Sequence, residues 1–320
     1  MPEVTLVEAI NLALARAMQD DPSVIVFGED VGINGGVFRA TVGLQQRFGP
    51  ERVLDTPLAE LLISGLCVGM AAQGLKPVGE IQFMGFIYPC IDQLVNHASR
   101  LRHRTQGRLS CPMVLRSPCG AGIRAPEHHS EHTEALLTHI PGLRVVIPSS
   151  PERAYGLLLA AIRDPDPVVF LEPTRLYRAG RGFVDDNGEA LSLDVAFVLR
   201  EGRDVTLIGW GSTKGVIEEA CELLNEEGIS ANQLQIRWLV PLHGEAILEL
   251  LKNARHTIIV ENNYSGQFAR YLRSETSFVP DGNIRKYDGE PFMPHHIVEA
   301  VKEQLAGKTH LSIPMHEIMV

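Results

Sequence analysis

The sequence predicts an α/β protein with two domains, each built around a mostly parallel sheet. Its 320 residues are long for one domain. Short apolar runs alternate with longer helical patterns, as they do in βαβ units. This alternation stops near residue 173 and resumes near residue 204. We therefore expect one domain at residues 1–175, a polar connector at 176–203 and a second, smaller domain at 204–320.

The first domain is predicted from patterns that follow one another along the chain. Thr5 followed by Glu8 is a capping-box signature, so we expect a helix to begin there. The apolar run 24–27 ends in Gly28-Glu29-Asp30, as a buried strand would before a functional loop. Further patterns predict strands at 53–54, 78–83, 113–115, 145–147 and 168–171, and helices at 60–73, 91–102 and 151–162.

The second domain repeats this rhythm over a shorter length. Its strands are expected at 205–208, 234–236 and 257–260, and its helices at 216–227 and 245–252. Ligands of such sheets bind beyond the carboxyl ends of the strands. The segments that follow each apolar run are therefore the candidates for chemistry.

The composition narrows the range of partners and compartments. A net charge of -10 argues against nucleic acid and against anionic membranes as partners. No run approaches the roughly 20 apolar residues of a membrane span. The five cysteines are odd in number, scattered and without a C-x-x-C pair. This usage fits a reducing cytoplasm and predicts neither a disulfide framework nor an iron–sulfur cluster in this chain.

Glu60 is the first candidate for acid–base chemistry. A predicted strand ends at Asp55, Pro57 turns the chain, and Glu60 then falls in the first turn of an apolar helix. A glutamate in this place can simply compensate the helix dipole. The helix is expected to be buried on most sides, however, which would place Glu60 in a dry site. A carboxyl group that can take up a proton there suits general acid–base catalysis.

The second candidate is the run Glu127-His128-His129-Ser130-Glu131-His132, in a glycine- and proline-containing loop after a predicted strand. Metal binding is one interpretation, but no cysteine and no second histidine pair with i, i+4 spacing completes a zinc site. A solvated polar loop is another interpretation. The third is a histidine that acts as a hydrogen-bond donor or base at the end of a strand.

Several stretches together resemble the beta subunit of the thiamine-diphosphate-dependent 2-oxo acid dehydrogenases, the decarboxylating enzymes of pyruvate, branched-chain 2-oxo acid and acetoin dehydrogenase complexes. The stretches are GEDVGINGGVF, RVLDTPLAE, GLKPVGEIQFMGFIYPCIDQLVNHASRLRHRT, RSPCGAGIRAPEHHSEHTEALLTHIPGLRVVIPS and AAIRDPDPVVFLEPTRLYR. The resemblance implies a transketolase-like pyrimidine-binding domain followed by a transketolase-like C-terminal domain.

The same resemblance implies an oxidative decarboxylation with acyl transfer to lipoamide, carried out only together with an alpha subunit. It implies an α2β2 heterotetramer that docks a lipoyl acyltransferase core, with thiamine diphosphate shared between the subunits. Magnesium and the diphosphate would be held by the alpha subunit through a Gly-Asp-Gly motif. That motif is absent from this sequence, which agrees with the division of labour.

Residue roles follow from the resemblance by position. Glu60 matches the glutamate that hydrogen-bonds the aminopyrimidine ring nitrogen and favours its imino tautomer. Leu58, Gln82 and Phe86 match cofactor-binding positions, with Phe86 packed against the pyrimidine. His129 matches the histidine near the reacting carbon, serving intermediate formation or acyl transfer. A structural monovalent cation, potassium by its preference for carbonyl oxygen, would be bound by the backbone carbonyls of Met113, Ala161, Ile162, Asp164 and Asp166.

The C-terminal third has a different resemblance. DVTLIGWGSTKGVIEEACELLNEEGIS, VENNYSGQFARYLR and KYDGEPFMP look more like the corresponding domain in the alpha subunit of 2-oxo acid:ferredoxin oxidoreductases. A ferredoxin-linked oxidoreductase subunit is therefore one alternative function. A non-catalytic assembly subunit is another, and a sugar-transferring transketolase relative is a third. The Glu60 and His129 motifs are of the dehydrogenase type, so we favour the dehydrogenase.

Overall fold

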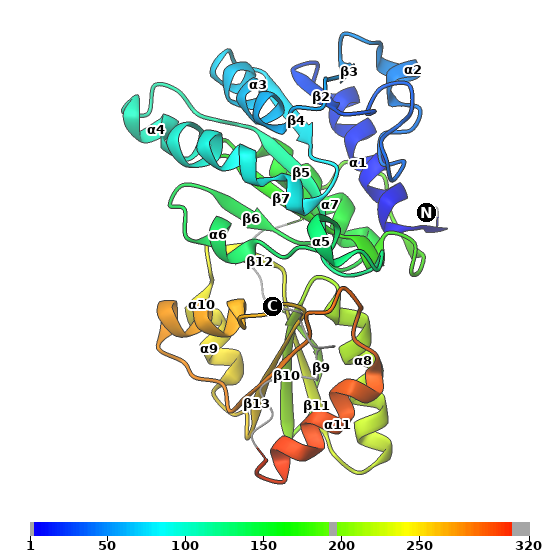
Figure 1. The fold of residues 1–320 in the computed structure, drawn as a ribbon, viewed down its shortest axis with the longest axis vertical. Coiled ribbons are helices and arrows are strands. Elements are labelled where there is room, and N and C mark those ends of the chain that lie inside the picture. Colours follow the sequence, from blue (N-terminus) through cyan, green and yellow to red (C-terminus); the bar gives the residue numbers. More distant parts are fainter. Residues whose placement is uncertain (1–2, 192–196, 309–320) are drawn as a thin grey trace.

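The computed structural model describes residues 3–191 and 197–308, and it has two α/β units, one above the other in Figure 1. Each unit contains a mainly parallel sheet with helices on both faces. The predicted fold class is therefore confirmed. Within the described ranges, no helix is long and apolar enough to cross a membrane. The five cysteines are all buried and free.

The first sheet has seven strands in the order β12-β6-β7-β5-β4-β2-β3. Six of them run parallel, and β12 pairs antiparallel with β6 at one edge. The strands are β2 (Val24–Gly28), β3 (Val53–Asp55), β4 (Lys76–Glu80), β5 (Val114–Cys119), β6 (Arg144–Val146), β7 (Val168–Pro173) and β12 (Trp238–Val240). A short ribbon joins β1 (Glu3–Val4) to β8 (Gly182–Phe183).

Alternating side chains of these strands build two different cores. Val24 and Val26 of β2 belong to the core under α1 (Leu6–Asp20) and α7 (Pro151–Arg163). Ile25 and Phe27 point to the other face, which α3 (Glu60–Ala72) covers. This two-sided burial is what strands of a parallel sheet require. The shorter helices of this domain are α2 (Leu44–Phe48), α4 (Leu101–Arg104), α5 (Pro126–His129) and α6 (Glu134–Thr138).

The capping box predicted for the first helix is present. The Thr5 hydroxyl accepts from the Glu8 amide at 3.4 Å, and the Glu8 carboxylate accepts from the Thr5 amide at 2.7 Å. These two bonds satisfy two amide groups that a helix start otherwise leaves unpaired. Helix α1 therefore begins at the position that the capping-box pattern predicted.

The second sheet has five strands in the order β14-β13-β10-β11-β9, of which β9 is antiparallel. Its strands are β9 (Phe197–Arg200), β10 (Val205–Trp210), β11 (Ala231–Ile236), β13 (Thr257–Glu261) and β14 (Gly282–Arg285). One core lies under α8 (Thr213–Glu226) and α11 (Pro294–Leu305). On the opposite face, α9 (Gly244–Leu251) and α10 (Gln267–Thr276) share a core cluster with the first domain.

The structure corrects several local predictions. The single helix expected at 91–102 is a π-helical turn at 93–97, a 3₁₀ turn at 98–100 and only then α4. Side chains of Ser99 and Arg100 both donate to the Val95 carbonyl and so compete with regular helix bonding. The strand expected to reach Phe83 ends at Glu80. β12, β14, α10 and α11 had no counterpart among the predicted elements.

A buried ion cluster joins the ends of three neighbouring strands. The Arg116 guanidinium on β5 donates two hydrogen bonds to the Glu172 carboxylate on β7, at 2.6 and 3.0 Å. It also donates to Glu80 on β4 at 2.9 Å. The Tyr177 hydroxyl donates to Glu172 as well. Burial raises the pKa of Glu80 and opposes the attraction of Arg116, so the cluster is stable only while all its members are present.

Replacing Arg116 with methionine is expected to lower the free energy of unfolding by about 3–5 kcal/mol, because two buried carboxylates lose their positive partner. Denaturant unfolding of the purified chain measures this. The loss should be larger at neutral pH than in mild acid, where protonation removes the unbalanced charge. Lys214→Met breaks an exposed i, i+4 pair instead and should change stability little. Equal effects of the two substitutions would contradict the importance of the cluster.

Candidate active site

Three predicted site residues and one further carboxylate, Glu29, follow four adjacent strands at the same edge of the first sheet. Glu29 comes directly after β2, Glu60 follows β3, Phe86 follows β4, and His129 follows β5. These strands are neighbours in the order β5-β4-β2-β3. Because parallel strands end on the same side, the four segments converge beyond the sheet, where ligands of such folds bind.

Glu60 is the first residue of α3 and lies half-buried at its N-terminus. The expectation that this helix is buried on most sides is wrong for the chain alone. Ile63, Cys67 and Ala71 on the inner side of the helix are buried, but Leu61 is 50% exposed and Leu62 43%. The exposed side forms an apolar groove of about 460 Å³, lined by Leu61, Leu62, Gly65, Leu66, Gly69, Met70, Gln73 and Leu75. An exposed apolar surface of this kind marks an interaction site.

Glu29 is a second carboxylate at this site, and sequence reasoning did not single it out. Its side chain is buried, the Ala59 amide donates to it, and its Oε1 has no partner among the described residues. Burial and the nearby charge of Glu60 raise its pKa. The raised pKa favours the protonated form of Glu29. The sequence could have pointed to Glu29 through its place directly after the predicted strand.

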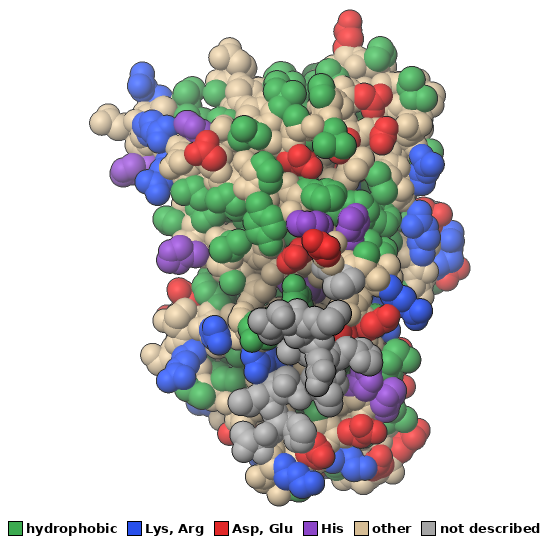
Figure 2. All heavy atoms as spheres, in the orientation of Figure 1, with side chains coloured by type: hydrophobic (Ala, Val, Ile, Leu, Met, Phe, Trp, Pro, Cys, Tyr) green, Lys and Arg blue, Asp and Glu red, His purple; other side chains and the backbone are tan. Residues whose placement is uncertain are grey.

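Two aromatic rings and two histidines form the other wall. His128 stacks on Phe86 with ring centroids 5.9 Å apart, and His129 meets Phe83 edge-on at 4.4 Å. Figure 2 shows histidine side chains below a broad apolar area of the first domain, near its junction with the second. Gly85 permits this contact, because a Cβ there would lie 2.4 Å from the backbone of His128. The glycine therefore sets how closely the histidine loop can approach Phe86.

The proton on His129 can be assigned from its hydrogen bond. Its Nδ1 lies 2.9 Å from the backbone carbonyl oxygen of Glu127. A carbonyl oxygen only accepts, so Nδ1 carries a proton, and in the neutral ring Nε2 presents a lone pair. His128 has a left-handed backbone with φ of 62°, a conformation rarely adopted by non-glycine residues. This turn orients the imidazole of the residue that follows.

Two predicted cofactor-binding residues lie beside this wall. Gln82 is half-buried in the segment between β4 and Phe86. Leu58 is 81% exposed in the turn before Glu60. A carboxyl pair and a phenyl ring fit the polar edge and flat face of an aminopyrimidine, and the unpaired oxygen of Glu29 fits a site still open to a polar group.

The residues predicted to bind a monovalent cation lie at the opposite edge of the sheet. Met113 precedes β5, and Asp164 and Asp166 precede β7. The Met113 carbonyl accepts from Val168 at 2.9 Å and the Ala161 carbonyl from Asp164 at 3.3 Å, and each oxygen keeps a second lone pair. The fifth carbonyl is that of Ile162, in the last turn of α7. No three histidine, cysteine or acidic side chains gather as metal ligands in the described part of the chain.

Comparison with known proteins identifies the family. Residues 2–180 match the transketolase pyrimidine-binding domain and residues 194–310 the transketolase C-terminal domain. The pyruvate dehydrogenase E1 component subunit beta of Acholeplasma laidlawii is 52% identical over 260 residues, covering 81% of this chain and 80% of that protein. This chain belongs to the 2-oxo acid dehydrogenase beta subunits. The 2-oxoisovalerate dehydrogenase subunit beta of Bacillus subtilis (strain 168) is 40% identical over 302 residues, 92% of both proteins.

Solved structures share the fold of this beta subunit. A split-gene transketolase, described as an inactive beta4 tetramer, has a TM-score of 0.76 and 19% identity and covers 95% of this chain and 99% of its own. A 2-oxoglutarate:ferredoxin oxidoreductase from Magnetococcus marinus has a TM-score of 0.71 and 16% identity, covering 95% and 65%. At such identities the likeness shows the fold alone. The dehydrogenase relative that spans 92% of the beta subunit is the stronger guide to its C-terminal third.

Replacing Glu29 with glutamine is expected to stabilise the isolated beta subunit at neutral pH. The raised pKa of Glu29 means that its stabilising contribution is present in acid and is lost as the pH rises through that pKa. The melting temperature of Glu29→Gln should therefore exceed that of the wild type near neutrality, and the two should converge in mild acid. Glu51→Gln, at an exposed position, is the control. A difference that does not depend on pH would contradict the assignment.

Proposed function

We propose that this chain supplies the aminopyrimidine-activating half of a thiamine-diphosphate site in a 2-oxo acid dehydrogenase. The reaction is the oxidative decarboxylation of pyruvate or a branched-chain 2-oxo acid, with transfer of the acyl group to lipoamide. The observation that carries the proposal is the pairing of Glu60 with buried Glu29 at the sheet edge where Phe86 and His129 also lie. The family membership supports the same chemistry.

Thiamine diphosphate, when bound, supplies a nucleophilic carbon and an electron sink for decarboxylation. The Glu60 carboxyl group would bind the aminopyrimidine ring nitrogen and would exchange a proton with it. Glu29 lies beside Glu60, and its raised pKa favours its protonated form. Leu58, Gln82 and Phe86 would hold the ring in place. The exposed side chains among them, Leu58 above all, need a second surface to exclude water.

His129 acts at a later stage of the proposed reaction. With Nδ1 hydrogen-bonded to the Glu127 carbonyl, its Nε2 is free to accept a proton or to bind a polar atom of the substrate. We assign it to intermediate formation or to acyl transfer, where the lipoyl thiol must lose its proton. A general base placed in this way typically contributes about 10²–10⁴-fold to the rate.

The proposed partner is an alpha subunit in an α2β2 heterotetramer. It would bind magnesium and the diphosphate, for which this chain has no Gly-Asp-Gly motif. The apolar groove on α3 begins next to Glu60, so a subunit that covers it also closes the catalytic site. The assembled enzyme is proposed to dock on a lipoyl acyltransferase core. The site is incomplete, and the chain inactive, without the alpha subunit.

We also propose a structural potassium ion at the carbonyls of Met113, Ala161, Ile162, Asp164 and Asp166. Nearby charges are balanced, since Arg144 pairs with Asp164 at 3.2 Å and Arg102 with Asp166 at 2.7 Å. A cation of low charge density suits such a set of neutral carbonyls. Its role would be to fix the loop between α7 and β7, far from the chemistry.

The potassium proposal predicts that the melting temperature of the chain depends on the cation. It should be higher in potassium chloride than in tetramethylammonium chloride at equal ionic strength, because only the smaller ion fits between carbonyl oxygens. Differential scanning calorimetry measures this without any catalytic assay. Equal melting temperatures across the series would exclude the site.

The function is tested by recovering the chain from its native lysate and assaying the eluate. The expected result is an alpha subunit together with thiamine-diphosphate-dependent decarboxylation linked to lipoamide. Recovery of iron–sulfur proteins that reduce ferredoxin or viologen would instead establish the oxidoreductase alternative. The assay with pyruvate and with branched-chain 2-oxo acids identifies the substrate.

Replacing Glu60 with glutamine should preserve assembly with the alpha subunit but lower proton–deuterium exchange at the cofactor C2 carbon by about 10²-fold or more, because an amide cannot donate and recover the proton. Nuclear magnetic resonance of quenched samples measures the exchange. Glu51→Gln, an exposed carboxylate on the turn before β3, is the matched control. Normal exchange in Glu60→Gln would favour a non-catalytic assembly subunit.

A further inference from the structure

We infer that Gln267, in the second domain, is a positioning residue for the histidine loop of the first domain, defined as residues 120–133. This inference rests on the proposed function, in which His129 of that loop takes part in catalysis. Gln267 belongs to the C-terminal stretch VENNYSGQFARYLR, which the proposed chemistry leaves without a role. Through Gln267, the second domain takes part in building the site.

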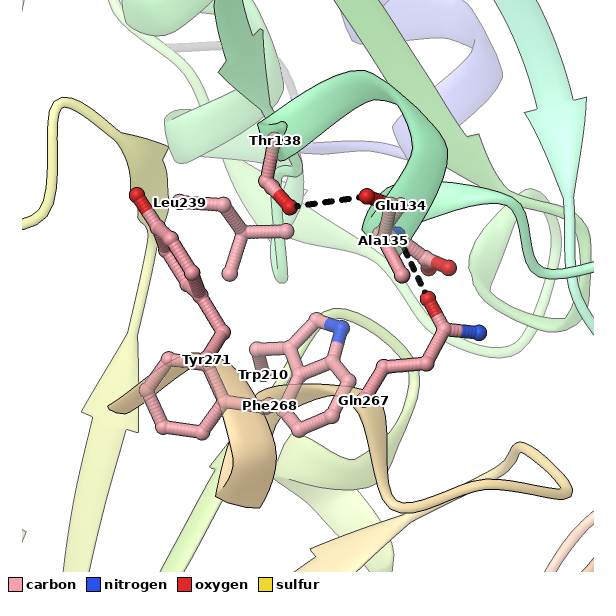
Figure 3. Close-up of a pocket in the computed structure, with 8 residues that line it drawn as sticks. All are labelled: Glu134, Ala135, Thr138, Trp210, Leu239, Gln267, Phe268 and Tyr271. Carbon is pink, nitrogen blue, oxygen red and sulfur yellow. Dashed lines mark hydrogen bonds between the residues drawn. The ribbon is translucent and has the colours of Figure 1, made fainter. Parts of the chain in front are cut away.

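The Gln267 amide group uses both of its polar atoms on the first domain. Its Nε2 donates to the backbone carbonyl of His132 at 2.9 Å, and its Oε1 accepts from the backbone amide of Ala135 at 2.6 Å. Figure 3 shows the side chain reaching from α10 to the start of α6. One side chain thus bridges the end of the histidine loop and the helix that follows. A shorter side chain could not reach both groups.

Gln267 is itself held firmly. It is the first residue of α10, whose start is fixed by buried acceptors at the end of β13. The Asn263 side-chain oxygen accepts from the amides of Gly266 and Gln267 at 2.7 and 3.0 Å, and the Glu261 carboxylate accepts from Phe268 at 2.9 Å. These bonds satisfy the free amides of the helix start. The position of Gln267 is therefore fixed by the second sheet.

The histidine loop has little to fix it from within. Ser130 Oγ, His132 Nε2 and Thr133 Oγ1 are buried and find no hydrogen-bond partner in the described ranges. Buried polar groups without partners destabilise the loop, so it depends on its other anchors. They include the Gly120 amide, which donates to the Glu131 carbonyl at 3.0 Å, and the contact between His132 Nδ1 and Glu134 at 2.8 Å. The ion pair between Arg124 and Glu290 at 3.2 Å is another.

The His132–Glu134 pair lies directly against the second domain. Burial opposes the charge on His132, yet Glu134 raises its pKa, and His132 in turn lowers the pKa of Glu134 despite burial. Trp210 of β10 packs on Glu134, and the space left among Glu134, Trp210, Gln267 and their neighbours is about 10 Å³. This is near the least that one water molecule needs. The hydrogen bond to His132 is partly buried, whereas the one to Ala135 lies at the surface.

A shift of the loop at His132 moves His129, three residues earlier. Catalysis is sensitive to such shifts, because a misplacement of about 1 Å can lower the rate by about 10²-fold. Removing the Gln267 amide should therefore affect turnover more than substrate affinity. A purely structural role would instead lower the thermal stability and affect every step alike.

The test compares Gln267→Ala and Gln267→Glu with the wild type in the complete α2β2 enzyme. Gln267→Glu keeps an acceptor for Ala135 but loses the donor to His132, so it serves if the alanine variant does not assemble. We expect kcat for lipoyl acylation to fall about tenfold or more, with KM for the 2-oxo acid within about threefold. Hydrogen–deuterium exchange should show lost protection of the Ala135 amide in Gln267→Ala. Arg273→Ala, on an exposed face of the same helix, should match the wild type.

Unchanged kcat in both variants would overturn the inference. So would a fall in kcat that comes with a clear loss of melting temperature, because general destabilisation would then explain it. So would unchanged protection of the Ala135 amide in Gln267→Ala. A wild-type complex without lipoyl-linked activity would overturn the proposed function instead. The exchange measurement would then still test the contact between the domains.

Discussion

The rest of the site depends on the buried ion cluster around the Arg116 guanidinium. The guanidinium binds carboxylates on both neighbouring strands, and so fixes the ends of β4, β5 and β7 relative to one another. The aromatic segment continues from β4 and the histidine loop from β5. Tyr177 donates to Glu172 and packs against Phe38, which in turn meets Phe83. The buried charges are thereby linked through three rings to the wall that carries His129.

Two features of the isolated chain are energetically unfavourable, and both fit the proposal that its site is half of a larger one. Glu29 is buried next to another carboxylate, with one oxygen unpaired. Beside this pair, α3 turns leucine side chains toward solvent. Both features are unfavourable for a free subunit, and the proposed ligand and partner surface would relieve them. Residues selected for function commonly depart in this way from what stability alone would favour.

Local patterns predicted much of the fold and part of the site. The capping box fixed the start of α1, apolar runs gave the parallel strands, and Glu60 was found from the turn before its helix. The features that the sequence did not predict depend on contacts between residues far apart in the chain. Burial of α3 depends on another surface, and pairing of β12 with β6 joins segments about ninety residues apart. The role of Glu29 needed its distance from Glu60, and that of Gln267 needed its contacts across the domains. The domain limits and site roles read from the sequence remain predictions.

The strand β12 has a consequence for how such a chain can change in evolution. It follows β11 in the sequence, yet it forms the outer edge of the first sheet. A chain cut at the connector would leave β6 with a row of unpaired backbone groups, an open template for aggregation. A recombination event that brought in a foreign second half would have to bring a strand that matches β6 as well. Gene shuffling between related lineages is thus restricted to donors that already share this edge.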